Sequence, residues 1–180
     1  MKKKFLIGFA FGISVLLSNV SNAAEFGVID MIKISEKAKV MKSLNAQKDK
    51  ALKNIQNTVD SKRKDFEKRE AELKTKSSML SDDAKKDFMN EVVNFQRDVM
   101  EYDKLTATKV NDIEKAYMET LAKIQRDYLD AVVKKIGKEK GLALVFNSQA
   151  AVVIDKNMDI TDLVISELDK QISEIELKVK

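Results

Sequence analysis

The stretch "LALVFNSQAAVVIDKNMDITDLVISEL", residues 142–168, decides the fold of this 180-residue chain, because its pattern changes from strand-like to helical within it. Residues 142–146 and 151–154 are short apolar runs rich in β-branched residues, and the polar "NSQA" between them suits the turn of a β-hairpin. Asp159 then precedes an apolar, periodic segment with Asp162 in its first turn, as expected where a carboxylate caps a helix. The chain is therefore predicted to end in two strands and a helix.

A third strand is predicted over residues 26–34, "FGVIDMIKI", which are mostly apolar and β-branched. The segments 24–34 and 141–180 together predict a small α+β head, in which the tail from Gln171 extends the last helix. A sheet of three short strands is marginally stable by itself, so the head is expected to oligomerise. The residues expected to form its oligomerisation surface are Val28, Ile29, Leu144, Val145, Phe146, Val152, Val153 and Ile154.

The middle of the chain, residues 35–140, predicts a long antiparallel helical hairpin, an arm built like a coiled coil. No proline interrupts it, and an apolar residue recurs every seven positions in its first half, the repeat that keeps one seam of a helix facing a partner. These residues are Leu52, Val59, Phe66, Leu73 and Leu80. The run "SSMLSDD" at 77–83 predicts the reversal, because serine and aspartate favour turns and helix N-termini.

The predicted reversal places apolar residues of the two helices opposite one another. Leu73 would face Phe88, Phe66 would face Phe95, and Val59 would face Tyr102, since both members of each pair are equally far from the turn. The fold class predicted is therefore α+β but mostly α, with a long antiparallel coiled-coil hairpin on a small β-containing head that oligomerises.

Basic residues lie beside the apolar seam toward the end of the arm, where Lys62, Arg69 and Lys76 recur once per heptad. The simpler interpretation is a solvated helix face, which is the commonest role of charges on a long helix. The functional interpretation is a diffuse binding surface for an acidic unfolded chain, in which flexible methionines add adaptable apolar contacts. The residues predicted for this surface are Lys62, Arg69, Lys76, Met79, Leu80, Lys85, Lys86 and Met89, whereas Met100 and Met118 are equally compatible with filling the seam.

The first 23 residues have the pattern of a secretory signal peptide, with Lys2 to Lys4 before a short apolar run and small residues up to Ala23. A membrane anchor is the weaker interpretation, because the run is short for a span. Cleavage would remove three lysines and reduce the net charge from +4 to +1. The sequence therefore predicts a soluble, exported protein, and so small a charge argues against nucleic-acid binding.

The residue inventory argues against an enzyme. The chain contains no histidine and no cysteine, so imidazole acid–base chemistry, thiolate nucleophiles and the usual transition-metal ligands are missing. No glycine-rich phosphate loop occurs, and the carboxylates alternate with lysines along the helices. No catalytic residue, metal site or cofactor is predicted.

The strand "GVIDMIKI", the Lys/Glu-rich hairpin, "GLALVFNSQAAVVID" and "DITDLVISELDK" together resemble the Skp/OmpH family of periplasmic chaperones. The resemblance covers essentially the whole chain after the signal peptide, although this chain extends beyond the usual family terminus near Lys170. It implies a homotrimer whose head is a β-barrel assembled from three subunits and whose arms enclose a cavity. It also implies a periplasmic location and an ATP-independent holdase that binds unfolded outer-membrane β-barrel proteins and prevents their aggregation.

Two other functions fit parts of the pattern. A periplasmic coiled-coil structural or adaptor protein, binding a folded envelope partner, would share the hairpin, but such proteins usually carry larger β-domains than the strands found here. Weak contact of the basic arm with anionic lipid or lipopolysaccharide is also compatible, although the narrow apolar stripe offers little area for insertion. Client range separates these alternatives, because a holdase protects several unfolded proteins and an adaptor binds one folded partner.

Overall fold

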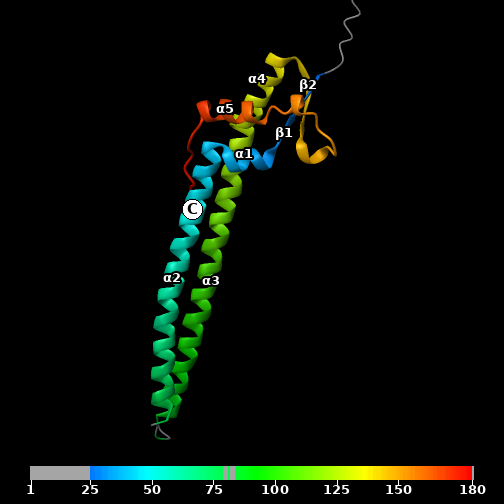
Figure 1. Ribbon diagram of the computed structural model, residues 1–180. Helices are drawn as coiled ribbons and strands as arrows, with labels where there is room; N and C mark the ends of the chain where they lie inside the picture. The colour runs from blue at the N-terminus through cyan, green and yellow to red at the C-terminus, as the bar shows by residue number, and fades with distance from the viewer. Residues whose placement is uncertain (1–24, 79–80, 82–83, 180) are drawn as a thin grey trace, which may run out of the picture.

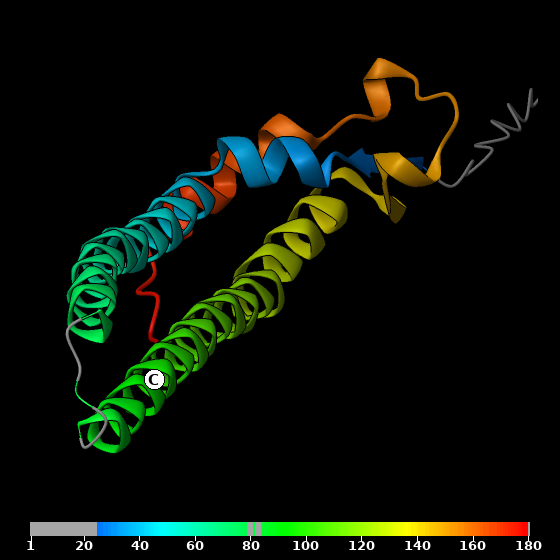
Figure 2. The same cartoon turned by 90° about the horizontal axis from the view of Figure 1, so that it is seen from below.

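The computed structural model describes residues 25–78, 81 and 84–179, so the predicted signal peptide lies outside the described residues. Two long helices lie side by side as an arm, and the remaining elements gather at one end of it (Figure 1). The view along the arm in Figure 2 shows that this head extends to one side of the hairpin. The mostly helical α+β class with a small β-containing head is thus confirmed.

The sheet has two parallel strands, β1 (Glu25–Ile29) and β2 (Leu142–Asn147), where a hairpin within residues 142–154 was predicted. Parallel pairing is possible because the whole arm forms the connection between the strands. A Cβ added at Gly27 would lie 2.7 Å from Leu142 Cδ1, so a side chain at this position of β1 would require the end of the Leu142 side chain to shift. The sheet therefore ties the two ends of the arm together.

The predicted strand over 26–34 is too long, because β1 ends at Ile29 and a helix, α1 (Met31–Lys37), begins directly after Asp30. The Asp30 carboxylate accepts hydrogen bonds from the backbone N–H groups of Ile32 (2.9 Å) and Lys33 (3.0 Å). This is the usual capping arrangement at a helix N-terminus, and it outweighs the β-branched composition of "MIKI".

The predicted strand at 151–154 is wrong. A short 3₁₀ turn at Ser148–Ala150 turns the chain away from β1, and the next residues run over the surface without pairing to the sheet. Val152 is 102% exposed and Val153 is 87% exposed, so these β-branched residues are almost unburied. Apolar composition predicts strand propensity, but a strand also requires a neighbouring backbone.

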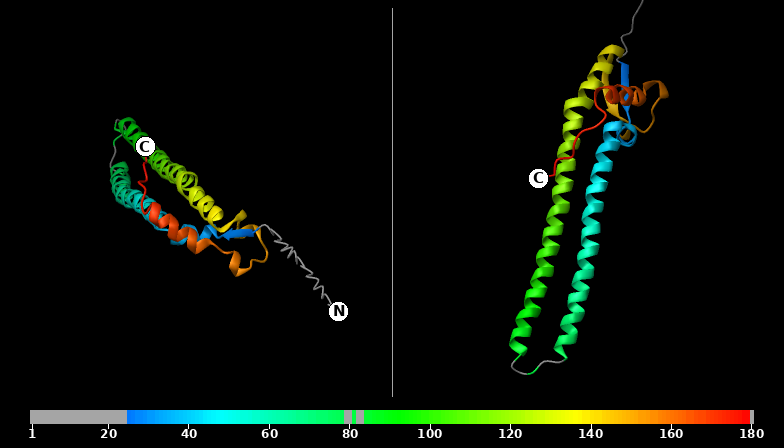
Figure 3. Two further views of the ribbon diagram at one scale, coloured as in Figure 1. Left: turned by 90° about the horizontal axis from the view of Figure 1, so that it is seen from above. Right: turned by 90° about the vertical axis from the view of Figure 1, so that its left-hand side faces the viewer.

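The predicted hairpin is confirmed. Helix α2 (Lys39–Ser77) and helix α3 (Lys85–Ile124) are antiparallel, and the chain reverses between them as expected. After α3, one π-helical segment (Gln125–Leu129) leads into α4 (Asp130–Lys140), which ends at Gly141 in the left-handed conformation (φ 68°). The right-hand view of Figure 3 shows the two long helices side by side.

The hydrophobic core lies at the root of the arm, where α1, the first turns of α2, the end of α3, α4 and α5 (Thr161–Gln171) meet. Its fully buried large side chains are Ile34, Val40, Leu44, Ile124, Val132, Ile136, Val164 and Leu168. The predicted helical extension beyond Gln171 is wrong. Helix α5 ends at that residue, and Ile172 takes an extended conformation (φ −150°, ψ 127°).

Candidate functional site

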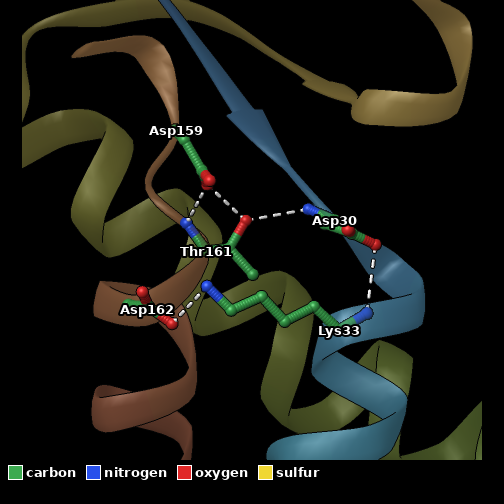
Figure 4. A network of polar contacts seen from close by, with 5 residues as sticks. All are labelled: Asp30, Lys33, Asp159, Thr161 and Asp162. Atoms are coloured by element: carbon green, nitrogen blue, oxygen red, sulfur yellow. Dashed lines mark hydrogen bonds and ion pairs between the residues drawn. The ribbon is translucent and has the colours of Figure 1, made fainter. Parts of the chain in front are cut away.

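A polar network connects the start of α5 to the junction of β1 and α1 (Figure 4). Asp159 Oδ1 accepts hydrogen bonds from the Thr161 backbone N–H (2.8 Å) and hydroxyl (2.5 Å), and Thr161 Oγ1 accepts one from the Asp30 N–H (2.9 Å). Asp159 thus holds the first N–H of α5, close to its predicted capping role. The hydroxyl and N–H of Thr161 lower the pKa of Asp159 below its usual value. Thr161 itself is fully buried.

Ion pairs fasten α5 to its neighbours around this network. Lys33 of α1 lies 2.7 Å from Asp162, and this hydrogen-bonded pair raises the pKa of Lys33. Glu167 pairs with Lys135 of α4 and with Lys170, and these bonds lower the pKa of Glu167. The head is thereby fixed to both roots of the arm.

An apolar surface is formed by exposed side chains of β1, β2 and the segment that follows β2. In the parallel register Phe26 is opposite Leu144 and Val28 is opposite Phe146, and the rings of Phe26 and Phe146 are 5.8 Å apart. A cavity of about 270 Å³ lies against these rings, next to Val153. We call the exposed large side chains of this surface the head patch: Phe26, Leu144, Phe146, Val152, Val153 and Met158.

The head patch contains half of the residues predicted for oligomerisation. Of the other four, Val28 is buried beneath the patch, whereas Ile29 and Val145 are partly buried and pack on the core of this same chain. Ile154 is partly buried and lines the cavity beside the Phe26 and Phe146 rings. Phe26 and Met158 were missed by the sequence analysis. The alternation of Phe26 with Gly27 could have indicated Phe26, because successive residues of a strand point to opposite faces.

The seam of the arm is aromatic at its middle. The rings of Phe66 and Phe95 are 5.9 Å apart, which confirms this predicted pair, and Phe66 also contacts Tyr102 edge-on at 5.7 Å. Val59 and Tyr102 line one cavity of about 360 Å³ with them. The two arm helices therefore pack through the residues whose heptad spacing predicted the hairpin.

The three basic residues beside the seam make contacts within the hairpin. Arg69 pairs with Asp98 of α3 at 3.1 Å, and Lys76 pairs with Glu91 of the same helix at 2.5 Å. Lys62 lies over the Phe66 ring, with its Nζ 5.0 Å from the ring centre. Arg69 and Lys76 therefore help to join α2 to α3, whereas the contact of Lys62 lies within α2.

The remaining predicted binding residues lie at the far end of the arm. Met79 and Leu80 fall outside the described residues, whereas Lys85 and Lys86 are exposed in the first turn of α3. Met89 follows one turn later and is also exposed. The predicted residues are thus spread along the distal half of the arm and form no compact site.

The structure adds a feature that the sequence analysis left open, because Met100 and Met118 are 66% and 60% exposed and do not fill the seam. They are separated by five full turns of helix, and Met89 and Val93 lie within about 20° of the same line at 3.6 residues per turn. This arm stripe is defined as Met89, Val93, Met100 and Met118. It lies about two fifths of a turn from the seam at 3.6 residues per turn, and its spacing was readable in the sequence.

A row of cations follows the arm stripe along α3. About 50° further round the helix lie exposed basic side chains, at 3.6 residues per turn. These are Lys86, Arg97, Lys104 and Lys115, none of which forms an ion pair with another described residue. One wall of the arm therefore combines adaptable apolar side chains with positive charge.

Residues 25–78, 81 and 84–179 contain no cluster of three or more acidic, His or Cys side chains placed to hold a metal ion. Within the same ranges, no helix combines the length and the apolar character needed to cross a membrane. The fold and its surfaces define a class of elongated α+β protein, with a helical arm carrying an apolar and basic wall on a head with an exposed apolar patch.

Comparisons with known proteins place the chain within this class. The family model described as "Outer membrane protein (OmpH-like)" matches residues 25–168. An uncharacterized protein of Aquifex aeolicus is 26% identical over 160 residues, which span 89% of this chain and 95% of that protein. A crystal structure from Caulobacter crescentus, of a protein assigned as an outer membrane chaperone (OmpH-like), has the same fold. Its TM-score is 0.78 at 14% identity, over 87% of this chain and 90% of that one.

The chain belongs to the OmpH-like family. The matched residues include the head, both arm helices and most of α5, but not the segment after Leu168.

Proposed function

We propose that this protein is an ATP-independent periplasmic holdase, which binds unfolded outer-membrane β-barrel proteins and prevents their aggregation. The observation that carries the proposal is the arm stripe with its row of cations, on a chain of the OmpH-like family. The likeness to a protein assigned as an outer membrane chaperone supports a chaperone-type role. Export through the predicted signal peptide would bring the protein to the compartment in which such clients are unfolded.

The chemistry of the arm wall suits a client without fixed structure. Methionine is flexible and polarizable, so Met89, Met100 and Met118 can adapt to many apolar side chains. Because these residues are spaced along the helix, each contact is weak and the client is held at many points. The cations beside them would attract an acidic client over a distance and speed its capture, an effect that salt weakens.

The head patch is proposed to join three copies of the chain into a trimer, as the family resemblance implies. Four of its exposed side chains, those of Phe26, Phe146, Val153 and Met158, line one cavity, and an exposed apolar surface of this kind usually marks an interface. The unpaired segment at Ala151–Ile154 has a strand-like composition and would gain a neighbouring backbone there. Three arms projecting from one head would then surround a client.

The proposal is tested by diluting a urea-unfolded outer-membrane β-barrel protein into buffer and following light scattering, at low and high salt. The mature protein is expected to suppress aggregation, less well at high salt. A variant carrying Met89→Ser, Val93→Ser, Met100→Ser and Met118→Ser is expected to lose most of this effect.

The matched control replaces similarly exposed apolar residues away from the stripe: Ile32→Ser, Leu105→Ser and Leu163→Ser. It should protect the client as the unmodified protein does. Absence of suppression at any ratio of the unmodified protein would contradict the holdase and favour the adaptor. Equal loss in both variants would contradict the assignment of binding to the arm stripe.

A further inference from the structure

The last described residues, 172–179, form an extended strap that leaves the end of α5 and crosses the root of the arm (Figures 1 and 3). Three of its side chains, Ile172, Ile175 and Leu177, are partly buried against the hydrophobic core. Helix α5 has contacts of its own with the core through Val164 and Leu168, which are fully buried, and with α4 through the Glu167–Lys135 ion pair. The strap adds a further apolar layer over the root of the arm.

A glutamine of α2 holds the strap by its backbone. Gln47 Nε2 donates a hydrogen bond to the Ile175 carbonyl (2.8 Å), and Gln47 Oε1 accepts one from the Leu177 N–H (2.9 Å). The side-chain amide thereby pairs with the backbone groups on either side of Glu176, as a neighbouring strand would. A second bond, from Nε2 to Ser43 Oγ (3.2 Å), helps to orient the amide. Recognition of this kind does not depend on the side chains of the bound segment.

The strap has the pattern of a half-buried strand. Ile175, Leu177 and Val179 alternate with charged residues, and Ile175 and Leu177 contribute the side chains that pack inward. Strands of transmembrane β-barrels alternate between apolar and polar residues in the same way. The strap therefore has the form of a short segment of the clients proposed above.

Space remains on the α3 side of the strap. A cavity of about 440 Å³ lies between Ala116, Thr120 and Lys123 of α3 and Ile175 and Lys178 of the strap. On the α2 side, Gln47 holds the strap by its backbone. The root of the arm is thus a groove that takes an extended segment and that the chain's own end fills only in part.

We propose that this groove binds an extended client segment with alternating apolar residues, and that the strap occupies it until a client displaces it. The inference rests on the proposed holdase function and adds to it a defined subsite and an internal competitor. Release of the strap breaks two hydrogen bonds and exposes the apolar side chains with which it packs on the core. Under this competition, the apparent affinity for clients equals the intrinsic affinity multiplied by the fraction of molecules whose groove is free.

The test uses the full chain and a fluorescent peptide of the strap sequence, SEIELKV (173–179), with fluorescence anisotropy as the readout. Leu177→Asp and Ile175→Asp are two independent variants that should release the strap, and Ser173→Asp adds the same charge at an exposed position. Both release variants are expected to bind the peptide roughly tenfold more tightly than the unmodified chain, whereas Ser173→Asp should not. A peptide of the same composition without alternation, SEEKILV, should bind weakly to all of them.

Adding Gln47→Ala to Leu177→Asp should abolish the gained peptide binding, because the backbone contacts of the groove are then lost. The inference is overturned if neither release variant, folded by circular dichroism, binds SEIELKV more tightly than the unmodified chain. It is also overturned if both peptides bind equally.

No outer-membrane protein is present in this assay, so its result is separate from that of the aggregation assay. Suppressed aggregation without peptide binding would reject the groove and keep the holdase. Peptide binding without any suppression would reject the holdase and keep the groove.

Discussion

At the scale of single residues, Thr161 joins two distant parts of the head. Its hydroxyl receives the Asp30 N–H and donates to Asp159, so one buried side chain links the end of β1 to the start of α5 across 131 residues of sequence. Buried polar groups contribute to stability mainly because an unpaired partner is costly.

Thr161→Val should therefore destabilise the protein by about 1–3 kcal/mol, because it keeps the shape and leaves the Asp30 N–H and the Asp159 carboxylate without this partner. Urea unfolding followed by circular dichroism measures the change. Thr75→Val is the control, since that exposed hydroxyl bonds only to Ala71 O within its own helix. Equal effects of the two substitutions would contradict the role given to Thr161.

A second single residue, Asp159, is expected to make the stability of the head sensitive to acid. The pKa of Asp159 is lower in the folded chain than in the unfolded one. The ionised carboxylate therefore contributes its full share to the free energy of unfolding above the unfolded pKa of about 3.9, and this share is lost as the pH falls through the folded pKa. Asp159→Asn keeps an acceptor for Thr161 and does not titrate. The urea concentration at the unfolding midpoint should fall between about pH 5 and about pH 2.5, and this fall should be smaller in Asp159→Asn than in the unmodified protein. An equal fall in both proteins would contradict the prediction.

At the scale of elements, the arm depends on a narrow seam and not on a broad core. Phe66 of α2 contacts two aromatic rings of α3, and ion pairs from Arg69 and Lys76 flank it toward the turn. Exposed pairs of this kind contribute little individually, so the aromatic contacts should dominate the pairing of the helices.

Phe66→Ala should loosen the distal arm and leave the head intact, with a local cost of about 1–3 kcal/mol for this partly buried ring. Amide hydrogen exchange should become faster in α2 and α3 beyond Val59 and stay unchanged in α5. Met100→Ala is the control, because that side chain projects away from the seam and should leave exchange unaltered. Faster exchange throughout the head would show that the arm and the head do not unfold separately.

At the scale of the whole molecule, the head patch and the arm stripe leave much apolar surface uncovered in a single chain. The proposed trimer would cover the patch, whereas the stripe would stay available to clients. Substitutions in the head patch should therefore change the oligomeric state, whereas substitutions in the arm stripe should change the protection of clients.

Phe146→Asp should convert the proposed trimer into monomers, because it places a charge at the centre of the head patch, and analytical ultracentrifugation measures the change. The fold of each chain should persist, since this ring is 44% exposed and lies outside the buried core cluster. Ile32→Asp adds the same charge to an exposed apolar site on α1 and should leave the trimer unchanged. A Phe146→Asp variant that remains a trimer would place the interface elsewhere.

The sequence by itself determined the arm. The heptad spacing of Val59, Phe66 and Leu73, the absence of proline and the symmetric placement of Phe95 and Tyr102 predict a hairpin, because helix periodicity and pairing across a single turn are local properties. The helix start after Asp159 was predictable for the same reason.

Only the tertiary structure decided the head and the tail. The parallel pairing of β1 with β2, the unpaired segment at Val152 and the strap on Gln47 each depend on residues that are distant in sequence, or on the lack of a neighbouring backbone. The alternation of apolar and charged residues in "SEIELKV" is compatible with a helix end or with a strand. The segment becomes an extended strap because Gln47, 128 residues from Ile175, supplies hydrogen-bond partners for its backbone. Such pairings have no local signature. The composition of a segment predicts which backbone conformations it favours, but not which distant groups will bond to its backbone N–H and C=O groups.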